Sequence, residues 1–389
     1  MAGAALSAFG DVVLNTSYAV LGGPERLINE IQKKTYPLSY ALKGRQAGEV
    51  LQGGREIRDQ IFLDEMSTFE EVLPGQDSTW QYPQVESEYT VRWRYWQDHY
   101  QWLDQTVDLN EGDPKLMYKR EAYKLHMRAW TSMINGADAT MFRAPNKATM
   151  EAAGGVSTYS IPVHCNEQTN TLFNSVTTAG AGGAWTVVQN IDPASKTRWK
   201  SAQQSYGATG AGFTVDSTDN VFYAFRKMWN KVHFQVPPTK QMYFENAELG
   251  RQVIFASDEG VARYEHLLRA QNDRLLSTYQ DPAYNAPSFN GIPVVYVSDL
   301  DTNSLYSVSG ATTTLGPEST ADITGPRYYW CNFNYLKLIF HSKWYFRLMD
   351  EISPERQPNN HIIPIQTWCN LVCLSRRRQG IVYPITTDN

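Results

Sequence analysis

The chain has 389 residues, of which 42% are hydrophobic, and this is enough to build two or three domains with cores of their own. Its formal net charge of −5 creates no global basic field, which disfavours a dedicated nucleic-acid binder but leaves room for local basic segments that face nucleic acid. The 11 Trp and 23 Tyr are typical of a protein rich in interfaces, and they also fit a carbohydrate-binding protein.

Residues 1–50 are interpreted as a mobile N-terminal arm. A mildly apolar stretch at 6–21, with some helical character, leads into a polar segment. The basic residues of that segment are Arg26, Lys33, Lys34, Lys43 and Arg45. The first 22 residues have no basic start typical of a signal peptide, and no run in the chain reaches transmembrane length. We therefore expect no membrane partner.

The next stretch, residues 44–114, holds ten aromatic residues, fifteen acids and five arginines but no lysine. Residues 82–96 alternate in character and place four large side chains on one face: Tyr89, Val91, Trp93 and Tyr95. Such a stripe must be covered by another part of the chain or by another molecule, because an isolated hairpin is only marginally stable in water. We predict an extended β-hairpin loop whose candidate intersubunit contacts are Trp80, Tyr82, Tyr89, Trp93, Tyr95 and Trp96.

A long helix is predicted to begin after Asp113, because Asp is a good cap and Pro114 suits the first helical position. It should run over about 114–135 or beyond, which at 1.5 Å per residue makes a rod of roughly 30 Å. The residues expected on its buried stripe are Tyr123, Met127, Trp130 and Ile134.

Residues 144–212 are irregular, with short strand-like pieces at 159–163 and 185–188. An α/β region follows, with a helix at about 217–232 and a strand around Phe234 and Val236. We then expect a strand at 252–256 and a helix capped by Ser257 that extends to about 276. Asn290-Gly291 predicts a tight turn into a strand at 292–297.

The last part of the chain is rich in predicted strands. A Gly/Thr/Ser loop at 309–325 precedes strands at 328–333, 337–341 and 344–349, and a long strand at 362–374 that we expect Pro364 to interrupt. Taken together, the elements predict an α+β fold with one compact part and several protrusions.

The sequence holds none of the commonest hydrolase, nucleotide-binding or zinc-protease motifs. Acid pairs such as Asp258-Glu259 could serve a carbohydrate-active enzyme, but adjacent acids point in different directions, whereas a glycosidase needs a facing pair. The seven histidines are spread singly. We therefore expect no catalytic residue, no cofactor and no metal.

The four cysteines are too few and too scattered for a disulfide framework, and their apolar surroundings favour buried thiols over metal ligands. They are Cys165, Cys331, Cys369 and Cys373. The only triple-basic run is Arg376-Arg377-Arg378. Two interpretations of this run stay open: a solvated strand end, or a contact with acidic neighbours or DNA phosphates.

The order of these elements resembles that of tailed-bacteriophage major capsid proteins of the siphovirus type, which have the Hong Kong 97 fold. Several short motifs resemble that family in the same order: 141–145 with 150–151 and 159–162, 190–193 with 198–199, 270–273 with 280–281, 289–294, and 368–371 with 376–380. Each motif is loose, and the resemblance depends on their number and order across nearly the whole chain.

The resemblance implies a division of the chain into arm, loop and two domains. Residues 1–50 would be the N-terminal arm, 51–107 the extended loop, and 108–143 part of a peripheral domain that contains the long helix as its spine. Residues 144–339 would form an axial α/β domain, with 144–212 as a candidate insertion. Residues 340–389 would supply the return strands of the peripheral domain and the C-terminus.

The resemblance also implies the function. The chain would be no enzyme but a major capsid protein that self-assembles into hexamers and pentamers of an icosahedral head enclosing double-stranded DNA. It would sit in the virion capsid and assemble in the host bacterial cytoplasm. Its partners would be copies of itself, a portal protein, a separate scaffolding protein, a candidate decoration or cement protein, and DNA through non-specific contacts. The alternatives are an encapsulin-like compartment shell and a carbohydrate-active enzyme.

Two residue-level expectations accompany this resemblance. The basic residues of the arm and the run Arg376-Arg377-Arg378 are candidates for DNA-facing or intersubunit contacts. In the type member of the fold, a lysine of the extended loop links covalently to a neighbouring subunit. No lysine occurs at residues 44–114 here, so we expect a shell without covalent links between subunits.

Overall fold

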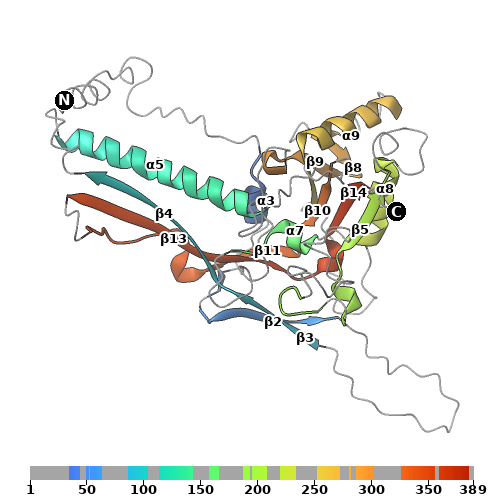
Figure 1. The fold of residues 1–389 in the computed structure, drawn as a ribbon, viewed down its shortest axis with the longest axis horizontal. Helices are drawn as coiled ribbons and strands as arrows, with labels where there is room; N and C mark the ends of the chain where they lie inside the picture. The colour runs from blue at the N-terminus through green and yellow to red at the C-terminus, as the bar shows by residue number, and fades with distance from the viewer. Residues whose placement is uncertain are drawn as a thin grey trace, which may run out of the picture. The chain divides into compact units, whose positions relative to one another are not determined.

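The computed structural model describes residues 35–43, 50–51, 53–63, 86–103, 114–142, 157–165, 187–192, 195–207, 220–233, 252–271, 280–281, 286–300, 326–354 and 359–384. The fold is a mixed α+β fold, as the sequence predicted (Figure 1). The described residues fall into two compact units, each treated below by itself. The smaller unit holds residues 95–137 and 343–368, and the larger unit holds the rest.

A seven-stranded mixed sheet is the centre of the larger unit, in the order β5-β14-β10-β6-β9-β8-β7. The strands are β5 (Ala202–Tyr206), β14 (Gly380–Pro384), β10 (Tyr328–Asn332), β6 (Gln252–Ala256), β9 (Ile292–Tyr296), β8 (Ala286–Phe289) and β7 (Gln280–Asp281). β14 runs parallel to β5, and β6 runs parallel to β9. The expected assignment of residues 340–389 to return strands of a peripheral domain and the C-terminus stays a prediction, and β14 of this segment lies inside the seven-stranded sheet.

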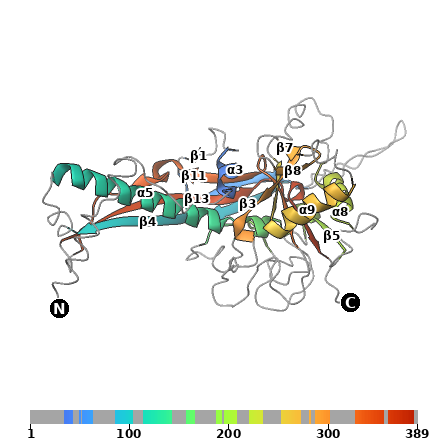
Figure 2. The ribbon, with the colours of Figure 1, turned by 90° about the horizontal axis from the view of Figure 1, so that it is seen from above.

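Two helices, α8 (Val221–Val232) and α9 (Asp258–Gln271), cover one face of the seven-stranded sheet (Figure 2). Phe225 of α8 is fully buried at the centre of this layer. Its ring centroid lies 5.2 Å from that of Tyr264 on α9 and 5.0 Å from that of Tyr328 on β10. Aromatic contacts therefore join both helices to the middle of the sheet.

The opposite face of the sheet is covered by the short helix α3 (Pro37–Lys43) and by Phe142. The rings of Tyr40 and Phe142 lie edge-on to Phe255 of β6, with centroids 5.5 Å and 5.6 Å away. The amide of Leu38 also donates to Asp138 Oδ1 at 2.9 Å. Residues 37–43 are thus a packed helix, whereas the sequence suggested a mobile arm over 1–50.

Local sequence signals explain most elements of the α/β region. Asn220 caps α8, since its side-chain oxygen accepts from the amide of Tyr223 at 2.7 Å. Ser257 caps α9 by accepting from the amide of Gly260 at 3.2 Å. The predicted turn at Asn290-Gly291 is confirmed, with both residues at positive φ (49° and 83°). The strand expected around Phe234 and Val236 lies outside the described residues.

Residues 157–165 and 195–207 differ from the sequence prediction. The strand-like piece at 159–163 is instead a short helix, α7 (Ile161–His164), because Pro162 fits the first turn of a helix. Trp199 ends a 3-10 turn, η1 (Thr197–Trp199), and is fully buried. Trp199 and the residues of α7 are buried, and the candidate insertion at 144–212 stays a prediction. Val188 forms only an isolated bridge with Ile191, and Trp185 lies outside the described residues.

A second sheet has the order β1-β11-β13-β12, with β4 also paired to β13. Its strands are β1 (Val50–Leu51), β11 (Leu336–His341), β13 (Asn360–Cys373), β12 (Arg347–Leu348) and β4 (Arg94–Leu103). Pro364 does not interrupt β13, because its carbonyl still accepts from the amide of Met349 at 2.9 Å. The strand predicted at 344–349 is wrong in extent, since only the two residues of β12 pair.

The predicted long helix is confirmed as α5 (Pro114–Thr140), which has 27 residues. Its buried stripe was predicted correctly at Trp130, which packs against the core of the smaller unit, but wrongly at two other positions. Met127 and Ile134 are 41% and 37% exposed, while Ala129 and Met133 pack against Ile365 in the smaller unit. The small side chain of Ala129 lets other elements pack close to α5, which the larger side chains of Met127 and Ile134 would prevent. The side chain of Tyr123, also expected on the stripe, lies outside the described residues.

The three arginines of the basic run occupy different environments. Arg376 begins the 3-10 turn η6 (Arg376–Arg378) and is fully buried. Its guanidinium donates to the carbonyls of Val163 at 3.2 Å, His164 at 3.4 Å and Trp199 at 3.1 Å. These carbonyls end α7 and η1, where helical turns leave acceptors without partners. Burial lowers the pKa of Arg376 to about 10, so the group is still charged at neutral pH.

Replacing Arg376 with Ala should strongly destabilise the larger unit, because three buried carbonyls would lose their donors and a cavity would form. We expect a loss of about 3 kcal/mol or more in the free energy of unfolding, measured by chemical denaturation. The exposed neighbour offers a control: Arg377→Ala should change stability by no more than about 0.5 kcal/mol. Equal effects of the two substitutions would contradict this structural role.

His164 lies fully buried beside Arg376, with its ring stacked on Tyr159 at 5.5 Å. Burial, reinforced by the charge of Arg376, lowers the pKa of His164 to about 3 from its ordinary 6.5. The unfolded chain therefore takes up this proton at a higher pH than the folded chain. The stability that neutral His164 provides is complete above about pH 6.5 and is lost progressively as the pH falls toward 3.

This linkage predicts a measurable difference between the wild-type chain and His164→Gln, which does not titrate. Between neutral pH and mildly acidic pH near 4.5, the wild type should lose about 2 to 3 kcal/mol more stability than the variant. Denaturant titrations at the two pH values measure it. If both proteins lose the same stability, His164 does not stay neutral in the folded chain.

Candidate functional site

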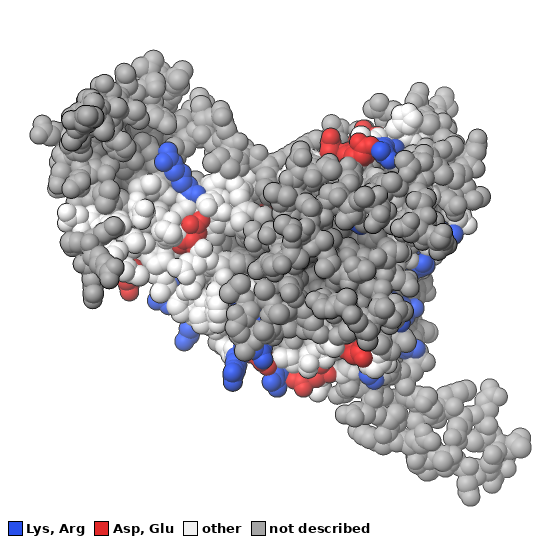
Figure 3. Space-filling model, viewed as in Figure 1, with Lys and Arg blue, Asp and Glu red and all other residues white. Residues whose placement is uncertain are grey.

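The ribbon expected as an extended loop begins with two paired strands, β2 (Glu56–Phe62) and β3 (Glu86–Arg92). Its polar face carries ion pairs: Arg58 lies 3.0 Å from Glu56 and 3.6 Å from Glu88, and Arg92 lies 3.3 Å from Glu56. Acidic and basic side chains lie close together in this region (Figure 3). The arginine side chains of these pairs are exposed to solvent, so this face is solvated and the ion pairs contribute little to stability.

The apolar face of the ribbon is covered by the chain itself. Tyr89, Val91 and Trp93 are 2%, 1% and 4% exposed. The indole of Trp93 donates to the carbonyl of Gly54 at 3.0 Å, and its ring lies 5.4 Å from that of His341. The sequence left open whether this stripe is covered by another part of the chain or by another molecule. For these three residues, the cover is another part of the chain. Trp80 and Tyr82 lie outside the described residues.

Long-range hydrogen bonds hold the base of the ribbon. The amide of Thr90 donates to the carbonyl of Gln189 at 3.2 Å, in the tight turn between Val188 and Ile191. On β13, the side chain of Asn370 donates to the carbonyl of Arg92 at 2.7 Å and accepts from the amide of Tyr159 at 2.9 Å. Sequence reasoning missed Asn370 and Gln189, because no local signal marks partners so far along the chain.

The smaller unit carries a group of stacked aromatic rings that is partly exposed and includes Tyr95, near the start of β4. Tyr95 is 53% exposed, and its ring lies edge-on to Trp368 of β13 at 4.8 Å. Trp368 in turn stacks on Trp344, with centroids 4.7 Å apart and an interplanar angle of 2°. Arg347 lies over Trp344 at 5.1 Å. We call Tyr95, Trp344 and Trp368 the aromatic platform.

The same unit holds other apolar side chains that are exposed to solvent. They are Tyr345 (42%), Leu348 (46%) and Ile352 (53%). Trp96, the remaining predicted contact, packs inward against the cluster of Ala129, Met133 and Ile365. The sequence pointed to Tyr95 but not to Trp344 or Trp368, which lie far from it along the chain.

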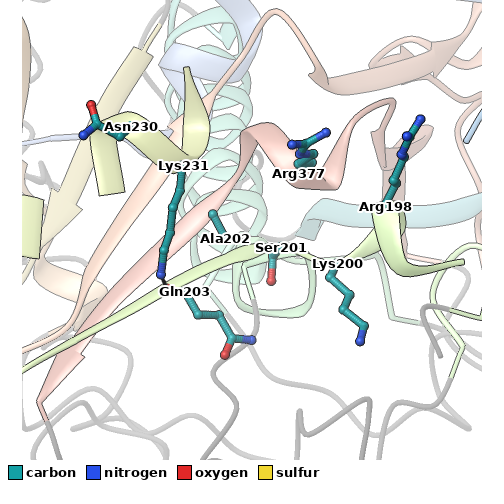
Figure 4. Close-up of a pocket in the computed structure, with 8 residues that line it drawn as sticks. All are labelled: Arg198, Lys200, Ser201, Ala202, Gln203, Asn230, Lys231 and Arg377. Carbon is teal, nitrogen blue, oxygen red and sulfur yellow. Dashed lines mark hydrogen bonds between the residues drawn. The ribbon is translucent and has the colours of Figure 1, made fainter. Parts of the chain in front are cut away.

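The predicted basic residues separate into three groups. Arg376 is buried, which corrects the expectation that it faces DNA or another subunit. Arg378 lies over the ring of Tyr335 at 4.6 Å. Arg377 lines a hollow with three further cations from elsewhere in the larger unit (Figure 4). The side chain of Lys43 and all of Arg26, Lys33, Lys34 and Arg45 lie outside the described residues.

Comparison with known proteins defines the fold. The capsid protein in the asymmetric unit of cyanophage A-1(L) is similar in structure at 14% sequence identity, with a TM-score of 0.52, over 96% of this chain and 99% of that one. The chain has the fold of a phage capsid protein. A match to mycobacteriophage Adephagia has 10% identity and a TM-score of 0.46, covering 96% of this chain and 99% of that one. No protein-family model and no curated protein sequence matches the chain.

Within this phage capsid fold, the cysteines are buried thiols, as the sequence predicted. All four are free and fully or almost fully enclosed. Burial raises the pKa of Cys373 to about 12, and it raises the pKa values of Cys331 and Cys369 well above their ordinary range. Among the described residues, no cluster of three potential metal ligands occurs, and no helix is long and apolar enough to cross a membrane.

Trp93 and Tyr95 stand two residues apart but should respond oppositely to truncation. Trp93→Ala removes a buried ring and its hydrogen bond, so we expect a loss of about 3 to 5 kcal/mol in the free energy of unfolding. Tyr95→Ala removes an exposed ring and one aromatic contact, so the loss should be about 1 kcal/mol or less. Thermal denaturation of the two variants tests this, and a large loss for Tyr95→Ala would place that ring in the core.

Proposed function

We propose that this chain is a major capsid protein that assembles into the hexamers and pentamers of an icosahedral phage head around double-stranded DNA. One observation carries the proposal: a chain with a phage capsid fold has an aromatic platform in which Tyr95 is 53% exposed and the rings of Trp344 and Trp368 are half-buried. Large aromatic side chains are enriched at the centres of interfaces, where they contribute much of the binding energy. A second copy of the chain is the natural cover in a self-assembling protein.

In this proposal, the elements take the roles that the resemblance to the Hong Kong 97 fold implied. α5 serves as the spine helix of a peripheral domain, and the seven-stranded sheet with α8 and α9 serves as the core of an axial domain. The β2–β3 ribbon serves as the root of the extended loop. Its buried inner face gives it a fixed base on its own subunit, from which residues beyond the ribbon reach a neighbour.

Assembly from one repeated contact explains why an exposed surface is useful. A contact between two different faces of identical subunits closes into a ring when the rotation per subunit fits. Any change in the free energy of that contact then recurs at every copy. Interface aromatics commonly cost about 2 kcal/mol or more when they are removed. The role proposed is structural rather than enzymatic, and the proposed partners are a portal, a separate scaffolding protein and a candidate decoration protein.

The assembly test compares Tyr95→Ala with a matched control, Tyr223→Ala. Tyr223 is also a half-exposed tyrosine, 46% exposed, but it lies on α8 in the larger unit. Negative-stain electron microscopy should show closed shells or capsomer rings for the wild-type chain, expressed with its scaffolding protein where needed. Tyr95→Ala should remain folded and soluble but form few or no complete shells, while Tyr223→Ala should assemble.

Three outcomes would contradict the proposal. A wild-type chain that stays monomeric under all these conditions is not a shell protein. Normal assembly of Tyr95→Ala would remove the aromatic platform from the interface. Shells from the natural source that protect protein cargo but no DNA from digestion would indicate an encapsulin-like compartment.

Cohesion without covalent links is a further expectation. Residues 44–114 lack lysine, arginine is not nucleophilic at neutral pH, and all four cysteines are buried within their own subunit. Capsids boiled in detergent without reductant should therefore run as one band near 44.2 kDa on a denaturing gel. A ladder of larger species would show that subunits are cross-linked.

A further inference from the structure

The basic hollow of the larger unit brings four cationic side chains together. Its volume is about 560 Å³, and it lies between α8, the start of β5 and η6 (Figure 4). The four cations come from three separate segments: Arg198 and Lys200, Lys231, and Arg377. The other lining residues are Ser201, Ala202, Gln203 and Asn230. None of these described lining residues is acidic, although the whole chain carries a net charge of −5.

The fold positions these cations through buried neighbours and backbone contacts. Buried Arg376 anchors η6 and thereby places Arg377, while buried Trp199 places Arg198 and Lys200 on either side of it. The ammonium of Lys231 donates to the carbonyl of Gln203 at 2.6 Å and to Gln204 Oε1 at 2.9 Å. Partial burial and the nearby charge of Lys227 lower the pKa of Lys231.

The composition of the hollow favours a phosphate backbone over a protein segment. Arg, Lys, Ser, Asn and Gln are the side chains that contact phosphate and sugar in nucleic-acid complexes. Protein interfaces usually have an apolar centre, whereas Ala202 is the only apolar residue among the described residues that line this hollow. We infer that this basic hollow binds the phosphodiester backbone of nucleic acid without sequence preference.

The inference deepens the proposed function, because it assigns to particular residues the contact between the shell and its DNA. Removing one phosphate contact lowers the slope of log binding constant against log salt by about 0.9. The double variant Arg198→Gln/Arg377→Gln should therefore lower that slope by about 2 and weaken binding at low salt by tenfold or more. Fluorescence anisotropy of a short, mixed-sequence DNA duplex, titrated with the unassembled full chain over a salt series, measures both quantities.

A matched control changes the same charge elsewhere. Arg128 on α5 and Arg226 on α8 are both exposed and do not line the hollow. Arg128→Gln/Arg226→Gln should keep the wild-type affinity and slope. Thermal denaturation checks that both double variants fold. If Arg198→Gln/Arg377→Gln does not fold, Lys200→Gln/Lys231→Gln takes its place with the same expected change in slope.

The outcomes separate this inference from the proposed function. Identical slopes for the hollow variant and the control variant, or no binding of the duplex by the wild-type chain, would overturn the inference even if shells form normally. A hollow variant that binds DNA like the wild type but fails to assemble would also overturn it, and would indicate an acidic segment of another copy in the hollow. Absence of shells from the wild-type chain would count against the proposed function alone.

Discussion

The buried guanidinium of Arg376 is the interaction on which the larger unit most depends. It carries a charge into the protein interior and offsets that cost by donating to carbonyls that end two separate turns. This fixes the path of the chain between β13 and β14. Gln379 then pairs with both backbone groups of Asn332, and Gly380 lies where any Cβ would come within 2.7 Å of the sulfur of Met228. The same few residues therefore place β14, seat α8 and present Arg377 to the basic hollow.

Successive residues of the aromatic stripe show how one stretch of sequence serves folding and, in the proposed function, assembly. Tyr89 and Trp93 bury their rings against their own unit, and Asn370 ties the ribbon to β13. The next residue of the alternating stripe, Tyr95, belongs to the smaller unit and is exposed, with its ring edge-on to the half-buried Trp368. A rigid base beside an exposed aromatic surface suits a protein that must first fold as a subunit and then join identical copies, because the interface is organised before contact.

Sequence reasoning succeeded where the signal is local and failed where it is not. The caps at Asn220 and Ser257 and the turn at Asn290 are set by neighbouring residues, so the elements that they bound could be predicted. Arg376 looked like part of a solvated run, since its partners Trp199 and Val163 lie 177 and 213 residues away. The polar strand β5 has no apolar alternation and becomes a strand because β14 pairs with it in parallel. On α5, Met127 was predicted to be buried because it is large and apolar. In the structure the small side chain of Ala129 is buried instead, since it allows closer packing.

The central claim is that copies of this chain cover one another's aromatic platform in a closed shell. A cryo-electron microscopy map of assembled particles, at a resolution that shows aromatic side chains, tests it most directly. The account predicts density of an adjacent subunit in contact with Tyr95, Trp344 and Trp368 at every position of the shell. Closed shells in which these three rings remain open to solvent would contradict it.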